Sequence, residues 1–373
     1  MNSTSLLDEN WHVLISLFPK NWKELAKQTG AMVRKFRSFP SEEALMRTLL
    51  LHIAQGYSLR ETVVKARLAN IANVSDVALL KRLRFAEEWF RALCQSLLKE
   101  RCYCDNDLQR STRICMKLVD ATEVKEPGKT GSLWRIHYSL ILPNLRCNYF
   151  KLTAAEGKGT GETFKHFPIN KGDCIIGDRG YSNPPGIDYI AKRGGYALVR
   201  VNTGSLKLYT TEENRFDLIT EIQKLETTGQ ICEWEVKIKG EASFICGRLC
   251  AIRKSKEAIK QALKKLKRKA QKEQKQLALE TIEFAKYIII FTTLPKNDFS
   301  TSYVLEWYRL RWQIELIFKR LKSLAGLGHL PKYDDVSSRA WLYGKLFVGL
   351  LIEKLIRYAS EISPWGYCLS EEK

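Results

Sequence analysis

No apolar run in this 373-residue chain approaches the roughly 20 residues that a helix needs to cross a bilayer. The opening stretch MNSTSLLDENWHVLISLF has no basic flank before its apolar part, so no secretory signal is indicated. We therefore expect a cytoplasmic protein with no membrane partner.

Histidine is scarce, and cysteine lacks the spacing of a metal site. The ten cysteines and five histidines are scattered along the chain. The closest cysteine pairs are Cys102 with Cys104 and Cys246 with Cys250. Neither pair has the gap of a zinc knuckle, so we expect reduced, mainly structural thiols. We expect His137, in a predicted strand, and His166, after a glycine-rich turn, to be structural or solvated.

Acidic residues are the scarcer of the two charged classes. The chain has 61 lysines and arginines against 41 aspartates and glutamates, a formal net charge of +20. Such a charge attracts polyanions, and nucleic acid is the commonest polyanion that a basic protein meets. From the net charge alone, an acidic membrane surface is the competing partner. The chain also has no evident Ser-His or Cys-His constellation, so we expect no protein nucleophile.

Residues 1–105 have the apolar periodicity of helices. SEEALMRTLLLHIAQG begins with Ser41 as a cap, and DVALLKRLRFAEEWFRALCQSLL repeats the pattern. Between them, YSLRETVVKARLANIANVSDVALLKRLR predicts two short helices around a small-residue turn, ending in Lys81, Arg82 and Arg84. This order is typical of a helix-turn-helix-like DNA reader. A helical bundle with a solvated basic face explains the pattern equally well.

The pattern changes to strands at STRICMKLVDATEV, and further strand-like runs follow at LWRIHYSLIL and RCNYFKLTAAE. GDCIIGDRGYSNPPGIDYIAKRGG then predicts a buried strand, a turn and a helix, and YALVRVN predicts another strand. Three strands in quick succession, followed by alternating strand and helix, are the order of an α/β core of the ribonuclease H type.

Two aspartates stand at the ends of predicted strands. Asp120 closes ICMKLVD, and Asp178 closes CIIGD. A carboxylate at the end of a buried strand lies at the rim of the sheet, within reach of phosphate and metal. Either aspartate alone could simply cap the next turn. Together, with the tails DAT and DRGY, they favour a shared site.

The stretch EWYRLRWQIELIFKRLKSLAGLG, residues 306–328, predicts one basic amphipathic helix with a single central acid, Glu315. At about 100° per residue, Tyr308, Arg311, Glu315 and Lys322 project within an arc of roughly 60°. The neighbouring apolar stripe consists of Trp307, Leu310, Ile314, Ile317, Phe318, Leu321 and Leu324. The polar face is therefore expected to open into a cleft. Alternatively, Arg311 and Lys322 only neutralise Glu315 in surface pairs.

Residues 203–299 are additional to the strands and helices that a minimal core of this type needs. QICEWEVKIKG and SFICGRLCAIRKS predict strands, so we expect a β-rich insertion that continues into a basic helix. Residues 253–275 carry eleven positive and two negative side chains. At the centre of this stretch lie Lys264, Lys265, Lys267 and Arg268. The stretch favours contact with the DNA backbone over a merely solvated face. Trp234, the only tryptophan of the insertion, is expected in the sheet or the core.

Three motifs together carry a resemblance to a known family. The spacing Y(x2)R(x3)E(x6)K in YRLRWQIELIFKRLK is similar to that of bacterial DDE transposases of the insertion-sequence-four type. LVDAT and IIGDRGY resemble the first and second acidic motifs of that family. The resemblance spans residues 113–355, in the order that the family requires.

The resemblance implies a ribonuclease H-like catalytic domain, a mixed sheet flanked by helices, at residues 106–355. The insertion at 203–299 would interrupt it, an all-α DNA-binding domain would precede it at 1–105, and a tail would follow at 356–373. We expect the apolar helix SSRAWLYGKLFVGLLIEKLIRYASEI to pack under this core.

The family implies that Asp120, Asp178 and Glu315 form the catalytic and metal-binding DDE triad. Three crowded carboxylates raise one another's pKa values unless divalent cations neutralise them. Two hard cations, Mg²⁺ or alternatively Mn²⁺, would meet that need. Phosphoryl transfer depends mainly on positioning and charge neutralisation, so the absence of a protein nucleophile fits.

The family also implies double-stranded DNA as the partner, both transposon ends and target, in a bacterial cytoplasm. Tyr308, Arg311 and Lys322 would hold the transposon end, and a homodimer would pair two ends. Two other functions remain open. One is a ribonuclease H-like nuclease without strand transfer, and the other is a catalytically silent DNA-binding protein derived from a transposase.

Overall fold

A computed structural model describes residues 10–33, 38–105, 114–127, 133–328, 330–332 and 334–362. The side chains of Cys102 and Cys104 and most of the predicted tail at 356–373 lie outside this description. Cys174 and Cys250 are buried free thiols, as predicted, and Cys94 and Cys147 are also buried. No helix of the described ranges is long and apolar enough to cross a membrane.

The N-terminal part is helical, as predicted. Its helices are α1 (Trp11–Ser16), α2 (Trp22–Gln28), α3 (Glu42–Ile53), α4 (Leu59–Leu68), α5 (Asp76–Phe85) and α6 (Glu87–Asp105). Ser41 caps α3 by accepting a hydrogen bond from the backbone N–H of Ala44 at 3.1 Å. Ser58 and Glu61 form a capping box that starts α4. The Ser41 cap confirms the helix start that the sequence indicated, whereas the capping box of α4 was not predicted.

The two short helices predicted around a turn are α4 and α5, and they pack against each other. The longer helix predicted to continue from Asp76 is divided at Ala86, where α5 ends and α6 begins. The structure thus confirms the two-helix arrangement, while DNA reading by these helices stays a prediction.

Among the described residues, nine strands form one mixed sheet in the order β3-β2-β1-β4-β5-β9-β8-β7-β6. The strands are β1 (Cys115–Lys125), β2 (Leu133–Ile141), β3 (Arg146–Ala154), β4 (Asp173–Gly177), β5 (Tyr196–Arg200), β6 (Leu208–Tyr209), β7 (Ile231–Lys239), β8 (Phe244–Arg253) and β9 (Tyr287–Thr292). β1, β2 and β3 form the predicted antiparallel meander, and β4 and β5 add in parallel to β1. Short helices connect these strands: η2 (Phe164–His166), η3 (Arg179–Tyr181) and α7 (Pro184–Ala191).

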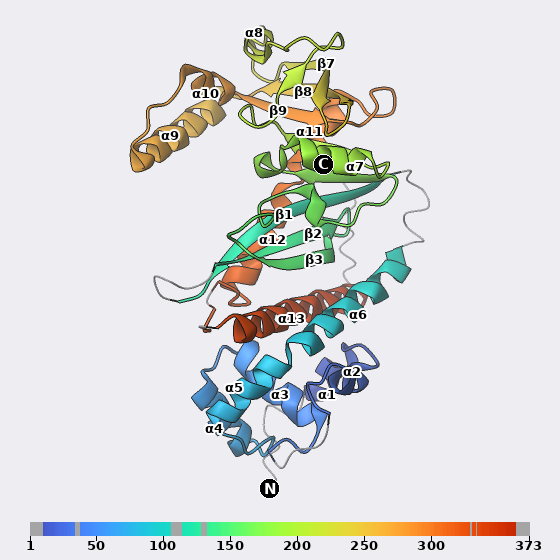
Figure 1. The fold of residues 1–373 in the computed structure, drawn as a ribbon, viewed down its shortest axis with the longest axis vertical. Helices are drawn as coiled ribbons and strands as arrows, with labels where there is room; N and C mark the ends of the chain where they lie inside the picture. Colours follow the sequence, from blue (N-terminus) through green and yellow to red (C-terminus); the bar gives the residue numbers. More distant parts are fainter. Residues whose placement is uncertain are drawn as a thin grey trace.

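The segment predicted as an insertion continues this sheet. β9 pairs antiparallel with both β5 and β8, and β7 and β6 follow beyond β8. The segment also carries α8 (Leu218–Gln223), α9 (Lys256–Glu273) and α10 (Leu279–Phe284). Figure 1 shows these elements at the end of the molecule opposite the N-terminal helices, with α9 projecting sideways. Trp234 lies half-buried on β7, where its Nε1–H donates to Glu221 at 3.0 Å, so the prediction of a sheet tryptophan is confirmed.

The single helix predicted for residues 306–328 is wrong, because the structure contains α11 (Thr301–Arg309) and α12 (Trp312–Ser323). Between them, Leu310 and Arg311 donate backbone hydrogen bonds to residues three positions earlier, which tightens the helix locally. The apolar stripe is also only partly buried. Ile314 and Phe318 are buried, whereas Leu324 is 83% exposed.

The last helix, α13 (Asp335–Ile362), packs against α6, α5, α3 and β3, so it joins the N-terminal helices to the sheet. In Figure 1, α13 and α6 lie between the sheet and the N-terminal helices. The prediction that this helix packs under the core is confirmed.

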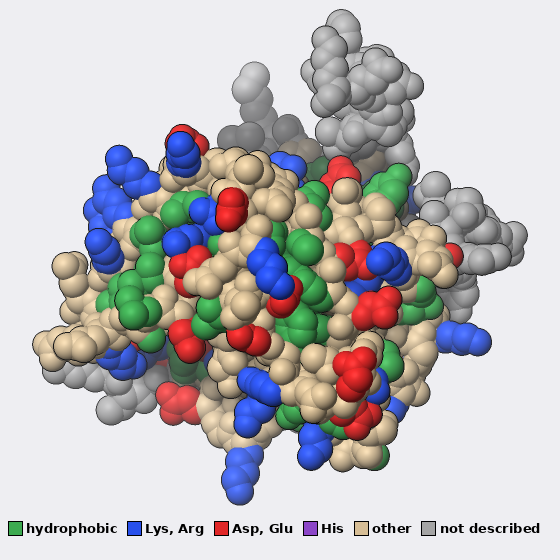
Figure 2. All heavy atoms as spheres, turned by 90° about the horizontal axis from the view of Figure 1, so that it is seen from above, with side chains coloured by type: hydrophobic (Ala, Val, Ile, Leu, Met, Phe, Trp, Pro, Cys, Tyr) green, Lys and Arg blue, Asp and Glu red, His purple; other side chains and the backbone are tan. Residues whose placement is uncertain are grey.

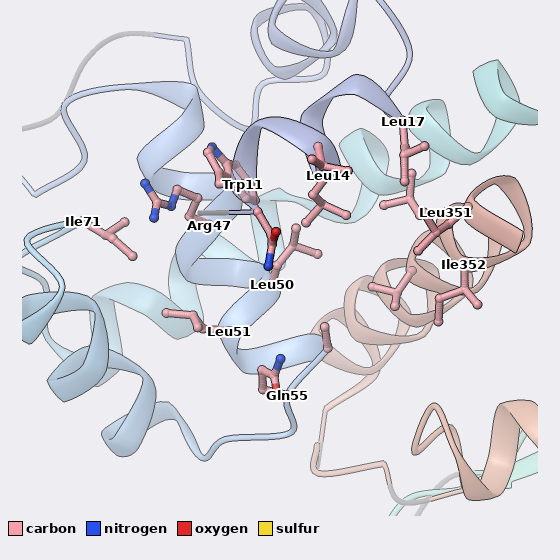
Figure 3. A pocket seen from close by; sticks show the side chains of 15 residues that line it. Trp11, Leu14, Leu17, Arg47, Leu50, Leu51, Gln55, Ile71, Leu351 and Ile352 are labelled. Atoms are coloured by element: carbon pink, nitrogen blue, oxygen red, sulfur yellow. The ribbon is translucent and has the colours of Figure 1, made fainter. Parts of the chain in front are cut away.

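An apolar cavity of about 500 Å³ lies where α1 and α3 meet α13. Leu14, Leu50 and Leu351 are among its lining residues (Figure 3).

Candidate active site

Strand register places Asp120 and Asp178 level with each other. β1 and β4 pair in parallel, and their last paired residues are Leu118 and Ile176. Asp120 and Asp178 each follow two positions later, so the two carboxylates leave adjacent strands at the same height. Asp178 comes directly after β4, as predicted. The prediction that Asp120 closes its strand is wrong, because β1 continues to Lys125 through its antiparallel pairing with β2.

Asp178 also has the capping role considered as its alternative. Its Oδ1 accepts a hydrogen bond from the backbone N–H of Gly180 at 2.7 Å, which starts η3. The cap fixes the side chain at the end of β4. The capping role and the strand-end role therefore coexist in one residue.

Asp120 lies in a strongly unfavourable environment for a negative charge. The pKa of Asp120 is raised to about 7, chiefly by burial, and the nearby charges of Asp178 and Glu162 act in the same direction. The N–H of Ala121, at 2.8 Å from Oδ1, and the guanidinium of Arg311 oppose this shift. The site is thus a concentration of carboxylates whose charge the protein only partly compensates.

Arg311 connects the sheet carboxylates to the helical one. It stands at the start of α12, where its Nη1 lies 3.8 Å from Asp120 Oδ2 while its Nη2 pairs with Glu315. Glu315 is 55% exposed, whereas Asp120 is 14% exposed. Tyr308 is buried on α11, with its ring centroid 5.9 Å from the Arg311 guanidinium.

The structure therefore brings Asp120, Tyr308, Arg311 and Glu315 together around one guanidinium. Lys322 lies farther along α12, half-buried beside Gly328. Because the helix is divided before Arg311, the four polar residues of the motif do not share the single face predicted for them. Tyr308 points into the core, and Glu315 faces solvent.

The donor chemistry at this site suits a hard divalent cation. Carboxylate oxygens are the ligands that Mg²⁺ and Mn²⁺ prefer, and a bound cation would offset the burial and the neighbouring carboxylates that raise the pKa of Asp120. Within the described ranges, however, no three His, Cys, Asp or Glu side chains are grouped closely enough to hold a metal ion. The pairing of Glu315 with Arg311 keeps that carboxylate occupied. The residues fit the ion in chemical type, and a bound ion would take the charge-neutralising place that Arg311 fills here.

The basic helix is α9, as predicted. Lys264, Lys265, Lys267 and Arg268 are all exposed on it. Lys269 and Lys275 instead pair with Glu273, at 3.7 and 3.4 Å. Figure 2 views the end of the molecule that carries α8, α9 and α10, and lysine and arginine side chains gather at its left edge.

A cationic cavity that was not predicted from the sequence lies between β5, α9 and α10. Arg179, Arg200 and Lys254 line this cavity, which has a volume of about 260 Å³. Burial lowers the pKa of Lys254 to about 8, and the charges of Arg200 and Arg179 act in the same direction. The Nε of Arg200 is buried without a partner among the described residues. Only Arg179, adjacent to Asp178, had a sequence signal that could have pointed to it.

Comparison with known proteins adds independent evidence. Residues 153–351 match the family described as the transposase DDE domain, a range that contains Asp178 and Glu315. The chain is 30% identical over 364 residues to the putative transposase InsL of insertion sequence element IS186A from Escherichia coli (strain K12), covering 95% of this chain and 96% of that one. It is 30% identical over 365 residues to the transposase of IS421 from Escherichia coli, with the same coverage. A transposase of IS231F from Bacillus thuringiensis subsp. israelensis is 24% identical, over 88% of this chain and 75% of that protein.

Proposed function

Because the chain belongs to the bacterial DDE transposases, we propose that it binds the terminal inverted repeats of an insertion sequence, cuts the DNA there and joins the ends to target DNA. The observation that carries this proposal is the arrangement of the paired strands β1 and β4 and of Arg311. Asp120 and Asp178 leave β1 and β4 at the same height, and Arg311 links Asp120 to Glu315.

Asp120, Asp178 and Glu315 would hold the divalent metal that this family generally uses, as two Mg²⁺ ions or alternatively Mn²⁺. When bound, such ions activate water or a DNA 3′-hydroxyl and neutralise the charge that develops on the phosphate. The protein's part is to hold the carboxylates at fixed positions. Asp120 and Asp178 are held by a buried sheet, while Glu315 must leave Arg311 before it can join them.

Release of Arg311 gives this residue a second role. Once Asp120 and Glu315 no longer need its charge, the guanidinium can bind a DNA phosphate beside the scissile bond. Tyr308 supports this position from the buried side, through its ring contact with Arg311. Lys322 would bind the transposon end farther along α12. In this way the same arginine would pair with the carboxylates in one state and bind the substrate phosphate in another.

DNA beyond the scissile phosphate would follow the positive surfaces. The cavity formed by Arg179, Arg200 and Lys254 begins beside Asp178, and α9 starts two residues after Lys254. Phosphate contacts along this path contribute affinity without reading sequence. Sequence reading would fall to the N-terminal helices, with α4 and α5 as the helix-turn-helix-like element.

The proposed domain organisation assigns β3-β2-β1-β4-β5 and the flanking helices to a ribonuclease H-like core. In this assignment residues 1–105 form the DNA-binding domain, and residues 203–299 extend the core sheet instead of forming a separate unit. Transposition requires two ends in one complex, so we propose a homodimer assembled on DNA.

The test compares end binding with end cleavage, using DNA that contains the terminal repeat bracketing the gene. Asp120→Asn, Asp178→Asn and Glu315→Gln should each bind this DNA about as well as the parent protein and fail to cut it in Mg²⁺. Undiminished cleavage by any one variant would remove that residue from the triad. Cleavage by the parent protein without joining to target DNA would favour a nuclease, and binding without cleavage would favour a silent DNA-binding protein.

A further inference from the structure

We propose that Glu162 is a fourth carboxylate of the metal centre, binding the water shell of the ion beside Asp178. This inference rests on the proposed metal-dependent function. Glu162 lies in the connection between β3 and β4, outside the motifs that carry the family resemblance. Its position in space, and not its sequence context, identifies it.

Glu162 and Asp178 converge over the backbone of Gly180. A Cβ at Gly180 would lie 1.6 Å from Glu162 Oε2 and 3.1 Å from Asp178 Oδ1. Glu162 Oε2 and Asp178 Oδ1 can therefore be no farther apart than the sum of these two distances. A side chain at position 180 would displace the Glu162 carboxylate, so the glycine of DRGY makes room for it.

The segment that carries Glu162 is fixed by hydrogen bonds to three successive carbonyl groups. Arg135 donates to the carbonyl of Thr160 at 2.6 Å. His166 Nε2 lies 3.0 Å from the carbonyl oxygen of Gly161. Asn183 Nδ2 donates to the carbonyl of Glu162 itself at 3.4 Å. These three contacts hold the backbone from which the Glu162 side chain extends.

His166 is itself held in place from the sheet. It is buried, its ring centroid lies 3.9 Å from that of His137 on β2, and Lys151 lies 3.4 Å from its Nδ1. Both histidines are thus structural, as predicted, and their role is to support the Glu162 segment. His137 adds a contact to Thr153 on β3 at 3.1 Å.

The surroundings of Glu162 point toward a bound cation. Burial raises the pKa of Glu162, and Asp178 and Glu123 raise it further against the opposing charge of Arg135. Nearby, the fully buried hydroxyl of Tyr181 has no hydrogen-bond partner among the described residues. This hydroxyl lies within electrostatic range of Asp120, Glu162 and Asp178. Crowded carboxylates beside an unpaired buried hydroxyl are surroundings that a hydrated cation would suit.

Binding through water follows from the geometry and from the chemistry of Mg²⁺. No three carboxylates of the described ranges are close enough to hold one ion directly. Mg²⁺ gives up its water reluctantly and keeps several water ligands in proteins. Carboxylates that bind this water shell orient the ion, and removing such an outer partner typically weakens metal affinity or activity by about 10- to 100-fold.

The test compares Glu162→Gln with Glu156→Gln, which makes the same charge change at an exposed position of the same connection. Binding of Mn²⁺ to the protein on uncut end DNA is measured by electron paramagnetic resonance, and cleavage is measured over a range of Mg²⁺ concentrations. Glu162→Gln should weaken Mn²⁺ binding and raise the half-saturating Mg²⁺ concentration by about 10- to 100-fold. Saturating Mg²⁺ should restore its cleavage, whereas Asp178→Asn should stay inactive.

Equal Mn²⁺ affinity for the parent protein, Glu156→Gln and Glu162→Gln would overturn the proposal, even if cleavage fell. Failure of the parent protein to cut end DNA would instead count against the proposed function, and the Mn²⁺ measurement would still decide the role of Glu162. Thermal unfolding of Glu162→Gln should match that of the parent protein without metal, because glutamine preserves the side-chain size.

Discussion

The guanidinium of Arg311 lies 3.8 Å from Asp120 and at the same time pairs with Glu315, four residues farther along the chain. One cation thus joins a buried carboxylate of the sheet to an exposed carboxylate of α12. The pairing neutralises the charges that a metal ion would neutralise in the working site. It also places a phosphate-binding group next to the position proposed for the scissile phosphate.

Arg311→Ala should therefore slow end cleavage on the order of 100-fold, because a phosphate held about 1 Å from its proper place loses roughly that much in rate. Single-turnover cleavage on preassembled complexes measures the effect. Arg320→Ala removes an exposed arginine from the same helix and serves as the control. Equal rates for the two variants would assign Arg311 a purely structural pairing role.

Neutralising the four exposed cations of α9 should reduce the salt dependence of DNA binding. Each lost phosphate contact lowers the slope of log K against log salt by about 0.9, so replacing Lys264, Lys265, Lys267 and Arg268 with Gln should lower it by up to about 3.6. Binding to unrelated DNA should weaken equally. The double variant of Lys165 and Lys192, which pair with Glu241, should leave the slope unchanged. An unchanged slope in the α9 variant would make this helix a solvated face.

The ion pair between Lys117 and Asp173 holds the starts of β1 and β4 together at 2.6 Å, with both side chains buried. Asp173→Ala leaves Lys117 buried without its partner, which should cost about 3–5 kcal/mol of unfolding free energy. Denaturant unfolding measures this loss. Glu213→Ala breaks the more exposed pair with Lys237 and should cost about 0–1 kcal/mol. Similar losses in both variants would show that burial does not make the Lys117–Asp173 pair more important for stability than the exposed pair.

The buried His52 should make the protein less stable as the pH falls. Burial lowers its pKa from 6.5 to about 4, and the charges of Lys332 and Lys345 contribute. Above pH 6.5 the histidine is neutral in both the folded and the unfolded chain, so it adds no pH dependence. Between these pKa values the unfolded chain binds the proton and the folded chain does not. This difference should remove about 1.4 kcal/mol of unfolding free energy per pH unit.

Urea unfolding at pH 7, 6 and 5 tests this expectation through His52→Gln. The variant should lose stability less steeply than the parent protein over this range. His12→Gln, at an exposed position of α1, should keep the parent slope. A parent slope in His52→Gln would show that the histidine does not resist protonation in the folded state.

Local patterns predicted the elements well. Alternation and turn residues located the meander β1-β2-β3, the strand β4 and helix α7, and Ser41 located the start of α3. The aspartate positions were informative because a carboxylate directly after an apolar run of residues is a local feature of the sequence. The level placement of Asp120 and Asp178 required strand pairing, which no local pattern specifies.

Other features depended on tertiary contacts. No proline or glycine lies between Thr301 and Ser323 to indicate the division of the helix at Leu310 and Arg311. The place of β9 in the central sheet could not be predicted, because its two partners, β5 and β8, are distant from it in sequence. Glu162 could not be predicted as a site residue either, because only the folded chain brings it next to Gly180.

The most direct test of the central claim is a change of metal preference at the proposed ligands. Asp178→Cys replaces a carboxylate with a thiolate, which Mn²⁺ accepts more readily than Mg²⁺. The measurement is cleavage of end DNA by Asp120→Cys and Asp178→Cys in each metal, with the corresponding Ala variants as controls. If these aspartates hold the ions, the Cys variants will be inactive in Mg²⁺ and regain cleavage in Mn²⁺, while the Ala variants stay inactive in both. Full cleavage by the Cys variants in Mg²⁺ would show that Asp120 and Asp178 do not bind the catalytic metal.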